Sequence, residues 1–430
     1  MNFDDVLIYI RKFSSFQEMG LLSYNKSLDK ILYLCKLLNN PNTKFISIHV
    51  GGTNGKGSVC SMLSAILQSS GYKTGLYTSP YINNFKENIK INNTSIEEKY
   101  IIDFVKKYKN TLDKVMPSLF EFMTLLAFSY FADNKIQLAV IEVGLGGRFD
   151  ATNIVNSIIS IITNIRYDHV NILGNSLCQI AFEKVGIIRY KSNLIIGENN
   201  ILKVNKVLFD YALLFQNKVY MAENIWHMQY HNNKYHFFSN WDKKYEYNIY
   251  TDINSPYQGK NIKTVITAIH ILNQNGFFIS KNNIEIGLNN VRLFTKFNCR
   301  WEFINNDPLT LLDIGHNVDG LKTIFDYLQL STYNNIHVII GLMKDKNIYD
   351  IMHILPKNRF IYYYCGIRNN KRSLDSRIMM KISIQLKLKG YCFETPLDAY
   401  KKSINNYNYK DLILIIGSTT IMDSIINFTR

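Results

Sequence analysis

Short, unbroken apolar runs alternate with longer segments of helical spacing over the first 190 residues. Four runs have the length of a strand and lack the polar alternation of a sheet with one wet face, which is typical of buried parallel strands. They lie at 44–50, 72–78, 137–143 and 158–164. The segments around them predict helices at 1–40, 59–67, 97–114 and 119–132. The first part of the chain is therefore expected to form a parallel sheet packed between helices.

The pattern changes twice farther along. Residues 193–250 carry short β-rich segments with turn signals such as His231-Asn-Asn-Lys234, which predict hairpins rather than alternating strands and helices. A helix is expected at 261–272, and from residue 309 the α/β alternation resumes. Its expected strands are 309–313, 336–341, 360–365 and 412–417. We therefore predict an α/β protein with a P-loop-type central-sheet N-terminal domain, 1–295, that carries a β-rich insertion, and a smaller Rossmann-like α/β C-terminal domain, 296–430.

Composition narrows the class of protein. A hydrophobic content of 47% excludes a mostly disordered chain, and a length of 430 residues favours two domains. The six cysteines show no CxxC pair or zinc-type spacing, which indicates isolated thiols in a reducing compartment. No uncharged apolar stretch reaches 18 residues, and the N-terminus does not resemble a signal peptide. We expect a cytoplasmic protein with no membrane partner.

The net charge of +15 suits polyanionic ligands such as nucleotides, nucleic acid or poly-acid substrates. General enrichment in Lys, Asn, Ile and Tyr explains the same surplus equally well, so charge alone does not decide. Because no stripe of alternating basic and aromatic residues is visible, nucleic acid is not the expected partner. A P-loop ATPase that depends on nucleic acid remains an alternative.

A glycine-rich loop follows the first apolar run. In Gly51–Ser58, backbone N–H groups can cradle phosphates because few side chains block their approach. Lys56 would reach the β- and γ-phosphates, and Ser58 would face a metal ion. The spacing differs from the generic P-loop, since three residues separate Gly51 from Gly55 and Gly57 separates Lys56 from Ser58. A glycine-rich turn with an incidental lysine is the competing interpretation. The ATP-binding residues predicted here are Thr53, Asn54, Gly55, Lys56, Gly57 and Ser58.

A carboxylate stands at the end of another predicted strand. Glu142 closes the run 137–143, and ligands of parallel sheets bind at the carboxyl ends of strands. His169 follows the run 158–164, but a lone histidine is more often structural, and magnesium prefers oxygen ligands. Two further polar residues have ordinary structural interpretations. Ser79 can belong to a simple Ser-Pro turn, and Lys184 can lie on the surface of a helix.

The phrase HVGGTNGKGS at 49–58 resembles the folylpolyglutamate synthase/dihydrofolate synthase branch of the Mur ligase superfamily. Further phrases follow in the order expected for that family, over most of the chain. They are LYTSP (76–80), SLFEFMT (118–124), IEVGLGGRFDATN (141–153), TNIRYDH (163–169), IAFEKVGII (180–188), YQGKN (257–261), CRWE (299–302), DIGHN (313–317), MKDK (343–346) and GS (417–418).

The resemblance implies a ligase in which ATP phosphorylates a carboxylate and the amine of L-glutamate then displaces the phosphate. It implies Mg²⁺, with two ions expected, and metal-binding positions at Ser79, Glu142, His169 and Lys184. The lysine is carbamylated in the family. The catalytic positions implied are Lys56, Lys184 and His169. The expected ligands are ATP, dihydropteroate or a folate, and L-glutamate, bound by a monomer.

The remaining site residues come from the same resemblance. Three further ATP contacts are implied at Asn261, Arg300 and Asp313. Substrate positions are implied at Ser118, Phe120, Glu121, Phe149, Asp150 and Ala151, with the incoming glutamate at His316 and Ser418. A pterin loop is weakly matched at Phe16-Gln-Glu-Met-Gly20.

The chain also departs from the family. Arg166-Tyr167 replaces a usual Gly-Leu, Cys299 a glycine, Val318 a proline, and Tyr81 a histidine. A cell-wall Mur ligase is disfavoured because only 50 residues precede the loop, whereas a Mur-type ligase acting on another carboxylate stays open. The residues do not decide between dihydrofolate synthase, folylpolyglutamate synthase and both, although the compact length and the SLFEF phrase favour the bifunctional type.

Overall fold

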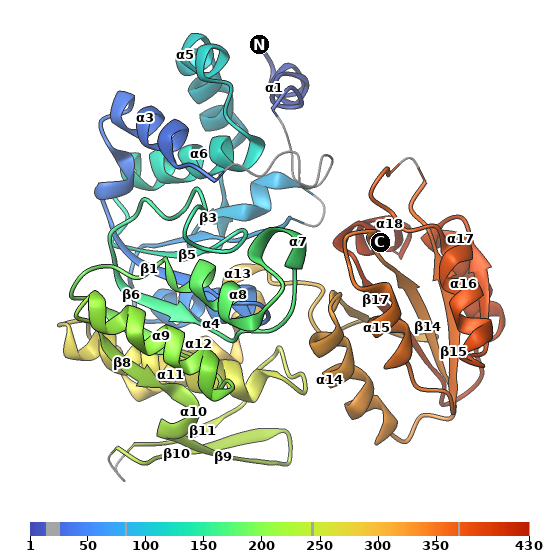
Figure 1. Cartoon of the computed structure of the whole chain (residues 1–430). Coiled ribbons are helices and arrows are strands. Elements are labelled where there is room, and N and C mark those ends of the chain that lie inside the picture. Colours follow the sequence, from blue (N-terminus) through green and yellow to red (C-terminus); the bar gives the residue numbers. More distant parts are fainter. Residues whose placement is uncertain (14–25, 82–83, 242–244, 369, 430) are drawn as a thin grey trace. The chain divides into compact units, whose positions relative to one another are not determined.

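The computed structural model describes residues 1–13, 26–81, 84–241, 245–368 and 370–429. The chain forms two compact units (Figure 1). Unit 1 comprises Met1–Arg166, Val170–Asn254 and Gln258–Phe297. Unit 2 comprises Asn298–Arg430 together with two short segments from earlier in the chain, Tyr167–His169 and Ser255–Tyr257. Residues of the N-terminal part therefore contribute to both units.

Unit 1 is built on an eight-stranded sheet of order β4-β3-β2-β5-β1-β6-β7-β8. Neighbouring strands are parallel throughout the part of the sheet with the order β2-β5-β1-β6-β7-β8. The hairpin β3–β4 adds an antiparallel edge beside β2. The four runs expected as strands are β1, β2, β5 and β6, whereas the short hairpin was not anticipated. The bounds are β1 (Ile46–Gly51), β2 (Thr74–Tyr77), β3 (Ile89–Ile91), β4 (Thr94–Ser95), β5 (Leu138–Glu142), β6 (Ser157–Ile162), β7 (Asn193–Ile196) and β8 (Lys218–Met221).

Helices cover both faces of this sheet, which explains the unbroken apolar runs. Side chains alternate between the two faces of a strand. Leu138 and Val140 of β5 accordingly enter the core beside α4, α11 and α12, while Ala139 and Ile141 enter the core beside α5 and α6 (Figure 1). The helices are α1 (Phe3–Ile10), α3 (Asp29–Leu37), η2 (Pro41–Thr43), α4 (Lys56–Ser69), η3 (Phe85–Asn88), α5 (Glu98–Val115), α6 (Leu119–Asp133), α7 (Val170–Leu173), α8 (Leu177–Val185), α9 (Leu202–Leu214), α10 (Ala222–Ile225), α11 (Gln258–Gln274), α12 (Lys281–Asn289) and α13 (Val291–Thr295).

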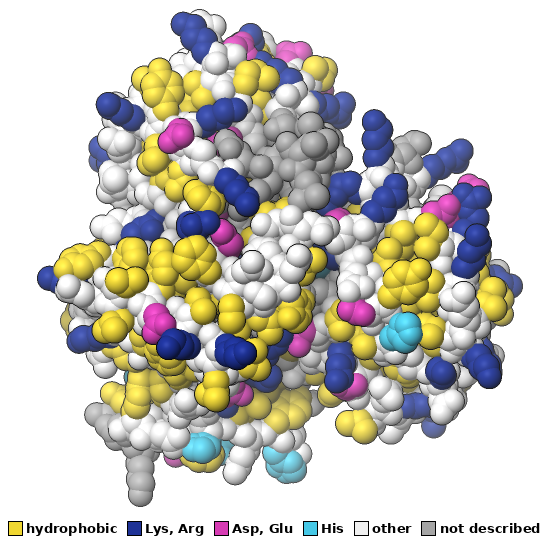
Figure 2. Space-filling view, viewed as in Figure 1, with side chains coloured by type: hydrophobic (Ala, Val, Ile, Leu, Met, Phe, Trp, Pro, Cys, Tyr) yellow, Lys and Arg dark blue, Asp and Glu magenta, His cyan; other side chains and the backbone are white. Residues whose placement is uncertain are grey.

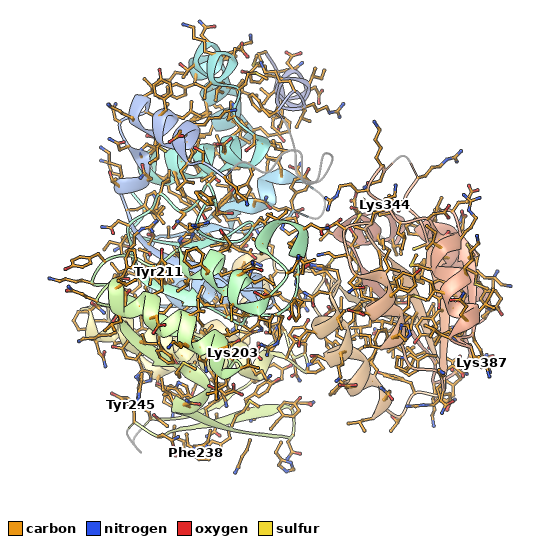
Figure 3. The ribbon with its side chains drawn as sticks, viewed as in Figure 1. Lys203, Tyr211, Phe238, Tyr245, Lys344 and Lys387 are labelled. Atoms are coloured by element: carbon orange, nitrogen blue, oxygen red, sulfur yellow. The ribbon has the colours of Figure 1, made fainter. Side chains whose placement is uncertain are left out.

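The segment 193–250 is only partly the set of hairpins predicted from the sequence. Its first half, β7–α9–β8, is a parallel strand–helix–strand unit that extends the main sheet. The helix was missed because α9 exposes Leu202, Leu213 and Leu214, which blurs its apolar stripe. Figure 2 shows hydrophobic side chains gathered on the surface over α9, and Figure 3 shows Lys203 and Tyr211 on the same helix.

The second half is a three-stranded antiparallel sheet, as expected. It has the order β11-β10-β9, with bounds β9 (Trp226–His231), β10 (Lys234–Ser239) and β11 (Glu246–Ile249). The predicted turn is present, because Asn232 and Asn233 join β9 to β10 with φ of 50° and 60°. Figure 3 places Phe238 on this sheet.

Unit 2 is a smaller α/β unit with a six-stranded sheet of order β12-β13-β17-β14-β15-β16. The four expected strands are β13, β14, β15 and β17. The two edge strands β12 and β16 were missed because they are only partly buried and carry no continuous apolar run. The elements are β12 (Glu302–Asn306), β13 (Leu309–Asp313), α14 (Val318–Gln329), β14 (Ile336–Gly341), α15 (Ile348–His353), β15 (Phe360–Cys365), α16 (Ser376–Gln385), β16 (Gly390–Phe393), α17 (Pro396–Asn405), β17 (Leu412–Gly417) and α18 (Thr419–Thr429). Within the described parts of both units, every helix is too short or too polar to cross a bilayer.

The close packing of α12 on α4 supplies a test of the unit 1 core. A Cβ on Gly287 of α12 would lie 2.6 Å from the Cα of Ile66 and 2.7 Å from its backbone nitrogen in α4. Backbone cannot yield as a flexible side chain does, so Gly287→Ala should lower the free energy of unfolding by about 1–3 kcal/mol. Urea unfolding followed by circular dichroism measures it. Gly276→Asn is the control, because Gly276 has open space and a φ of +88° that asparagine tolerates. An unchanged midpoint for Gly287→Ala would contradict the packing.

Candidate nucleotide and metal site

The glycine-rich loop joins β1 to α4 and is pinned by the residues after β6. A Cβ on Gly52, whose φ is +132°, would lie 1.9 Å from the Oγ1 of Thr163, so only glycine fits there. The backbone N–H groups of Thr53 and Asn54 donate to the backbone oxygen and the side-chain oxygen of Asn164, at 3.0 and 2.9 Å. These two hydrogen bonds fix the first part of the loop against the end of β6.

The loop leads directly into α4, and no side chain caps the first N–H groups of this helix. Gly55 precedes the helix in a left-handed conformation and has no side chain to accept from Gly57 or Ser58. The N-terminus of a helix favours anions because of these N–H groups and the helix dipole. Lys56 adds a cation at the first helical position, where its Nζ donates to the carbonyls of Gly52 and Thr53 at 3.3 and 3.2 Å.

Lys184 is buried against the loop instead of lying on a helix surface. Its side chain comes from α8, and its Nζ donates to the carbonyl oxygen of Gly52 at 2.7 Å. The ammonium groups of Lys56 and Lys184 thus converge on the same backbone oxygen. Two like charges brought together at a helix N-terminus strongly favour a bound polyanion between or beside them.

Glu142 and Ser79 meet beside the first turn of α4. Glu142 ends β5 and is buried, and its Oε2 accepts from the backbone N–H of Ser79 at 3.0 Å. The same oxygen lies 3.6 Å from where a Cβ on Gly57 would stand. The hydroxyl of Ser58, also buried, belongs to this turn. Carboxylate and hydroxyl oxygens are the hard donors that Mg²⁺ prefers, so this donor set fits that ion.

His169 is not part of that group in unit 1. It lies in the segment Tyr167–His169 that packs with unit 2, and its φ is +49°. Among the described residues, no set of three or more His, Cys, Asp and Glu side chains is arranged to hold a metal ion. Of the four predicted metal positions, unit 1 therefore brings together Ser79 and Glu142, with Lys184 at the adjoining loop.

Asp168 is the centre of a charged cluster in unit 2 that sequence reasoning missed. Its carboxylate contacts Lys346 Nζ at 2.5 Å, His316 Nε2 at 3.5 Å and His169 Nε2 at 3.8 Å. Burial alone would raise the pKa of Asp168, but the charges of His169 and Lys346 and the hydrogen bond from His316 hold it well below its ordinary value. The phrases TNIRYDH and MKDK contain both missed residues, yet their sequence separation conceals the pairing.

Asp313 is buried in unit 2 with its carboxylate fully engaged. Its Oδ2 accepts from the hydroxyl of Tyr257 at 2.5 Å and from the N–H of Trp301 at 3.0 Å, and its Oδ1 accepts from the N–H of Gly315 at 2.8 Å. Burial raises its pKa. The positive charge of Arg300 lowers this pKa and so opposes part of the rise. Tyr257 was not anticipated, although it opens the YQGKN phrase.

Ser418 follows β17, where its Oγ lies 3.4 Å from the hydroxyl of Thr420. Asn261 lies in unit 1, on α11, and its Oδ1 is 2.4 Å from where a Cβ on Gly55 would stand. The structure therefore brings Asn261 to the phosphate loop, a placement that the YQGKN phrase alone does not reveal.

Ser118 and Glu121 act as the N-terminal cap of α6. The N–H of Ser118 donates to Glu121 Oε2 at 2.7 Å, and the N–H of Glu121 donates back to Ser118 Oγ at 3.2 Å, which forms a capping box. Phe120 presses on the next glycine turn, since a Cβ on Gly144 would lie 2.5 Å from its ring. The cap thus fixes where Phe120 points.

Asp150 and its neighbours complete that turn. The carboxylate of Asp150 accepts from the N–H of Leu145 at 2.8 Å and from the hydroxyl of Thr152 at 2.5 Å, and burial raises its pKa. The guanidinium carbon of Arg148 lies over the ring of Phe149, 4.5 Å from the ring centroid. Ala151 is buried. The predicted pterin loop, 16–20, lies outside the described residues.

Three departures from the family pattern can be explained by the structure. Cys299 has a φ of +57°, a conformation that glycine adopts without strain, so the cysteine pays a local cost. Val318 is the first residue of α14, where proline is well suited. Arg166 forms an ion pair with Glu198 at 2.9 Å, and its backbone N–H donates to Thr53 Oγ1 at 3.1 Å. The arginine side chain therefore adds the ion pair with Glu198, whereas the bond to Thr53 does not depend on the side chain.

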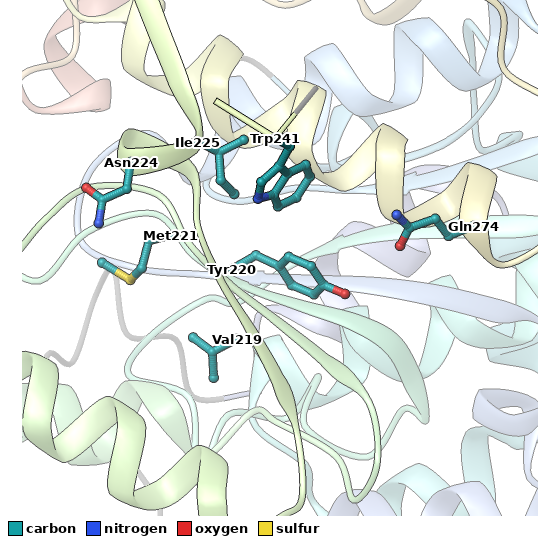
Figure 4. Close-up of a pocket in the computed structure, with 7 residues that line it drawn as sticks. All are labelled: Val219, Tyr220, Met221, Asn224, Ile225, Trp241 and Gln274. Carbon is teal, nitrogen blue, oxygen red and sulfur yellow. The ribbon is translucent and has the colours of Figure 1, made fainter. Parts of the chain in front are cut away.

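A separate pocket of about 410 Å³ lies at the β8 edge of unit 1 (Figure 4). Its lining includes Tyr220, Trp241 and Gln274 and contains no charged side chain. It shares no residue with the predicted sites, and without a cation it offers little to a phosphate.

Comparisons with known proteins show the family and the fold of the chain. The Mur ligase middle domain matches residues 50–271, and the glutamate ligase domain of Mur ligases matches residues 299–419. The dihydrofolate synthase/folylpolyglutamate synthase of Buchnera aphidicola subsp. Schizaphis graminum is 31% identical over 401 residues, which cover 91% of this chain and 90% of that protein.

Solved structures share the fold. E. coli FolC in complex with DHPP and ADP has a TM-score of 0.86 at 22% identity, over 100% of this chain and 97% of that one. The bifunctional folylpolyglutamate synthase/dihydrofolate synthase from Yersinia pestis, complexed with AMPPNP and a Mn ion, has a TM-score of 0.83 at 21% identity, over 100% and 98%. With its two Mur ligase domains and this coverage, the chain belongs to the folylpolyglutamate synthase/dihydrofolate synthase family and is an ATP-dependent ligase.

Proposed function

We propose that the protein is a bifunctional enzyme that adds L-glutamate to dihydropteroate and to reduced folates through an acyl phosphate. The observation that carries the proposal is the ammonium of Lys56 at the start of α4, where no side chain caps the helix, beside the buried carboxylate of Glu142. This arrangement suits the transfer of a γ-phosphoryl group, for which a protein must supply positioning and positive charge.

The chemistry proceeds in two displacements. The substrate carboxylate attacks the γ-phosphorus of ATP, so that a carboxyl oxygen–phosphorus bond forms and ADP leaves. The amine of L-glutamate then attacks the acyl carbon, an amide bond forms, inorganic phosphate leaves, and the amine loses its proton. A free carboxylate resists the second attack because its leaving group would be oxide.

Unit 1 residues would bind and orient the nucleotide. The N–H groups at the start of α4 and the ammonium of Lys56 would hold the phosphates, and Asn261 would contact the adenine edge or the ribose. For two residues of unit 2, the resemblance implies that Arg300 contacts the γ-phosphate and Asp313 a ribose hydroxyl or the base. A bound Mg²⁺ would neutralise developing charge on the phosphates, held by Glu142 together with Ser58 and Ser79. The Yersinia pestis relative, which binds a Mn ion with AMPPNP, supports a divalent metal.

A second magnesium ion is proposed near His169 and a carbamylated Lys184. Carbamylation converts an ammonium into an anion with two oxygens, which suits a metal, whereas an ammonium repels one. Burial of Lys184 at the phosphate loop supports this role. The remaining roles follow the family: residues 1–295 bind ATP and folate, with the substrate near Phe120 and Phe149–Ala151, and residues 296–430 bind glutamate near His316 and Ser418.

We also propose that the enzyme works in the cytoplasm as a monomer, without a nucleic-acid partner. Six free cysteines support a reducing compartment. A Mur-type ligase for another carboxylate and a nucleic-acid-dependent ATPase are the alternatives that the first experiment separates.

The purified protein should form product with both acceptors. ATP, Mg²⁺ and L-glutamate are supplied with either dihydropteroate or tetrahydrofolate, and products are identified by mass spectrometry. We expect one added glutamate on the first and one or more on the second. Product with only one acceptor would make the enzyme monofunctional. ATP hydrolysis stimulated by DNA or RNA, without ligation, would contradict the proposal.

Replacing the loop lysine should abolish ligation without unfolding the protein. Lys56→Ala removes the ammonium from the phosphates and should cost about 10²–10³-fold in kcat, as the loss of an electrostatic transition-state contact does. The melting temperature should stay near that of the wild type. Lys203→Ala, on the exposed surface of α9, is the control. Near-normal turnover by folded Lys56→Ala would remove this lysine from the mechanism.

Lys184 should carry one molecule of carbon dioxide under bicarbonate. Intact-protein mass spectrometry or electron density at the Nζ detects it, with Lys206→Ala as the control for a surface lysine. Lys184→Ala should be nearly inactive, and a short acid such as acetate should partly restore turnover by filling the carbamate position. An unmodified Lys184 in an active crystal with ATP and magnesium bound would refute the modification.

A further inference from the structure

Glu198 is a largely buried carboxylate to which the proposed mechanism gives no role. It follows β7 in unit 1, and its side chain is 13% exposed. Its Oε1 accepts a hydrogen bond from Asn164 Nδ2 at 2.7 Å. Its Oε2 accepts from Arg166 Nη2 and from Lys260 Nζ, each at 2.9 Å. A buried carboxylate is costly unless it is paired and hydrogen-bonded, and here both of its oxygens are engaged.

The partners of Asn164 allow its buried amide only one orientation. A backbone N–H can only donate, so the N–H of Asn54 must face the Oδ1 of Asn164, at 2.9 Å. A carboxylate can only accept, so Glu198 must face the Nδ2 on the other side. If the amide turned by 180°, both hydrogen bonds would be lost. Glu198 therefore decides which end of Asn164 the phosphate loop meets.

The peptide group of Asn54 is held by side chains from the end of β6 on both sides. Its N–H donates to Asn164 Oδ1, and its carbonyl oxygen accepts from Thr163 Oγ1 at 2.6 Å. The next residue, Gly55, is the left-handed residue from which α4 begins. The orientation of the Asn164 amide thus bears on the path of the loop where it enters the helix.

We propose that Glu198 is a positioning residue that holds the Asn164 amide toward Asn54 and so keeps the phosphate loop in its binding conformation. Arg166 and Lys260 engage the Oε2 of Glu198, which leaves its Oε1 for Asn164. The inference rests on the proposed function, since it assumes that the loop binds the phosphates of a nucleotide.

An exchange of donor and acceptor between the two side chains tests the proposal. Asn164→Asp keeps an oxygen for Asn54 but turns its other oxygen toward the carboxylate of Glu198. Glu198→Gln must place its NH₂ group either against the two cations or against the NH₂ group of Asn164. Each change alone should weaken the binding of AMPPNP with Mg²⁺ roughly tenfold, the scale of one hydrogen bond to a charged group.

The double variant Asn164→Asp/Glu198→Gln should recover most of that affinity. Its new amide donates to its new carboxylate, and the amide oxygen accepts from Arg166 and Lys260. Every donor then faces an acceptor again, and the net charge equals that of the wild type.

Two measurements on the full chain report on this arrangement. Calorimetry gives the affinity for AMPPNP with Mg²⁺. Hydrogen exchange followed by mass spectrometry, without nucleotide, gives the protection of the peptide that carries Asn54. Exchange there should be faster in each single variant and should slow again in the double variant. The matched controls are Glu98→Gln, which removes the charge that pairs with Lys86, and Asn110→Asp, on the exposed surface of α5.

The outcomes are distinct. An effect of net charge alone would make Glu198→Gln bind AMPPNP more tightly, because a negative charge near the phosphates is removed. Losses in both single variants with recovery in the double variant support the inference. Tighter binding by Glu198→Gln, single variants that behave like their controls, or a double variant no better than the single variants would overturn it.

Two further results remain informative. If Asn164→Asp does not fold, Glu198→Gln and the double variant still decide, because the proposal requires the second change to improve on the first. Failure of the wild type to bind AMPPNP with Mg²⁺ overturns the proposed function, whereas the hydrogen-exchange comparison continues to test the role of Glu198.

Discussion

The absence of a side chain at Gly52 is the constraint on which the site in unit 1 depends. A Cβ there would collide with the Oγ1 of Thr163. Glycine therefore allows the end of β6 to close on the loop, where Asn164 holds the N–H groups of Thr53 and Asn54. The Gly52 carbonyl is also the acceptor on which both loop lysines converge. The conformation of the loop and the placement of both lysine side chains thus depend on the same glycine.

The order of the strands brings the remaining groups to that loop. Of the four neighbouring strands, β5 ends at Glu142, while β2, β1 and β6 are followed by Ser79, the phosphate loop and Asn164, respectively. Parallel strands end at the same edge of a sheet, so residues far apart in sequence become neighbours. Helix α11 then adds Gln258 and Asn261 from much later in the chain. The site is built by topology more than by any single motif.

The sequence indicates the fold well where burial is complete. The unbroken runs of β1, β5, β14 and β17 identify a covered parallel sheet, because both faces of such strands need apolar side chains. The same signal fails for the edge strands β12 and β16, which are exposed, and for α9, whose solvent face carries leucines. The pattern of apolar residues along the sequence indicates which elements are buried, and it misses elements that are only partly buried.

The candidate site was predictable only in part. The roles of the loop at 51–58 and of Glu142 can be inferred from the neighbouring residues in the sequence. The burial of Lys184, the contacts of Asp168 with Lys346, and the hydrogen bond from Gln258 to Ser58 depend on partners more than a hundred residues away, which spacing cannot reveal.

The central claim is that the phosphates of ATP bind at the start of α4 beside Glu142. A crystal structure with AMPPNP and Mg²⁺ tests it most directly. The account predicts phosphates against the N–H groups of 55–58, with Lys56 turned from the loop carbonyls toward them and the metal at Glu142. Nucleotide bound in the pocket of Tyr220 and Trp241, with Lys56 still folded onto Gly52, would contradict it.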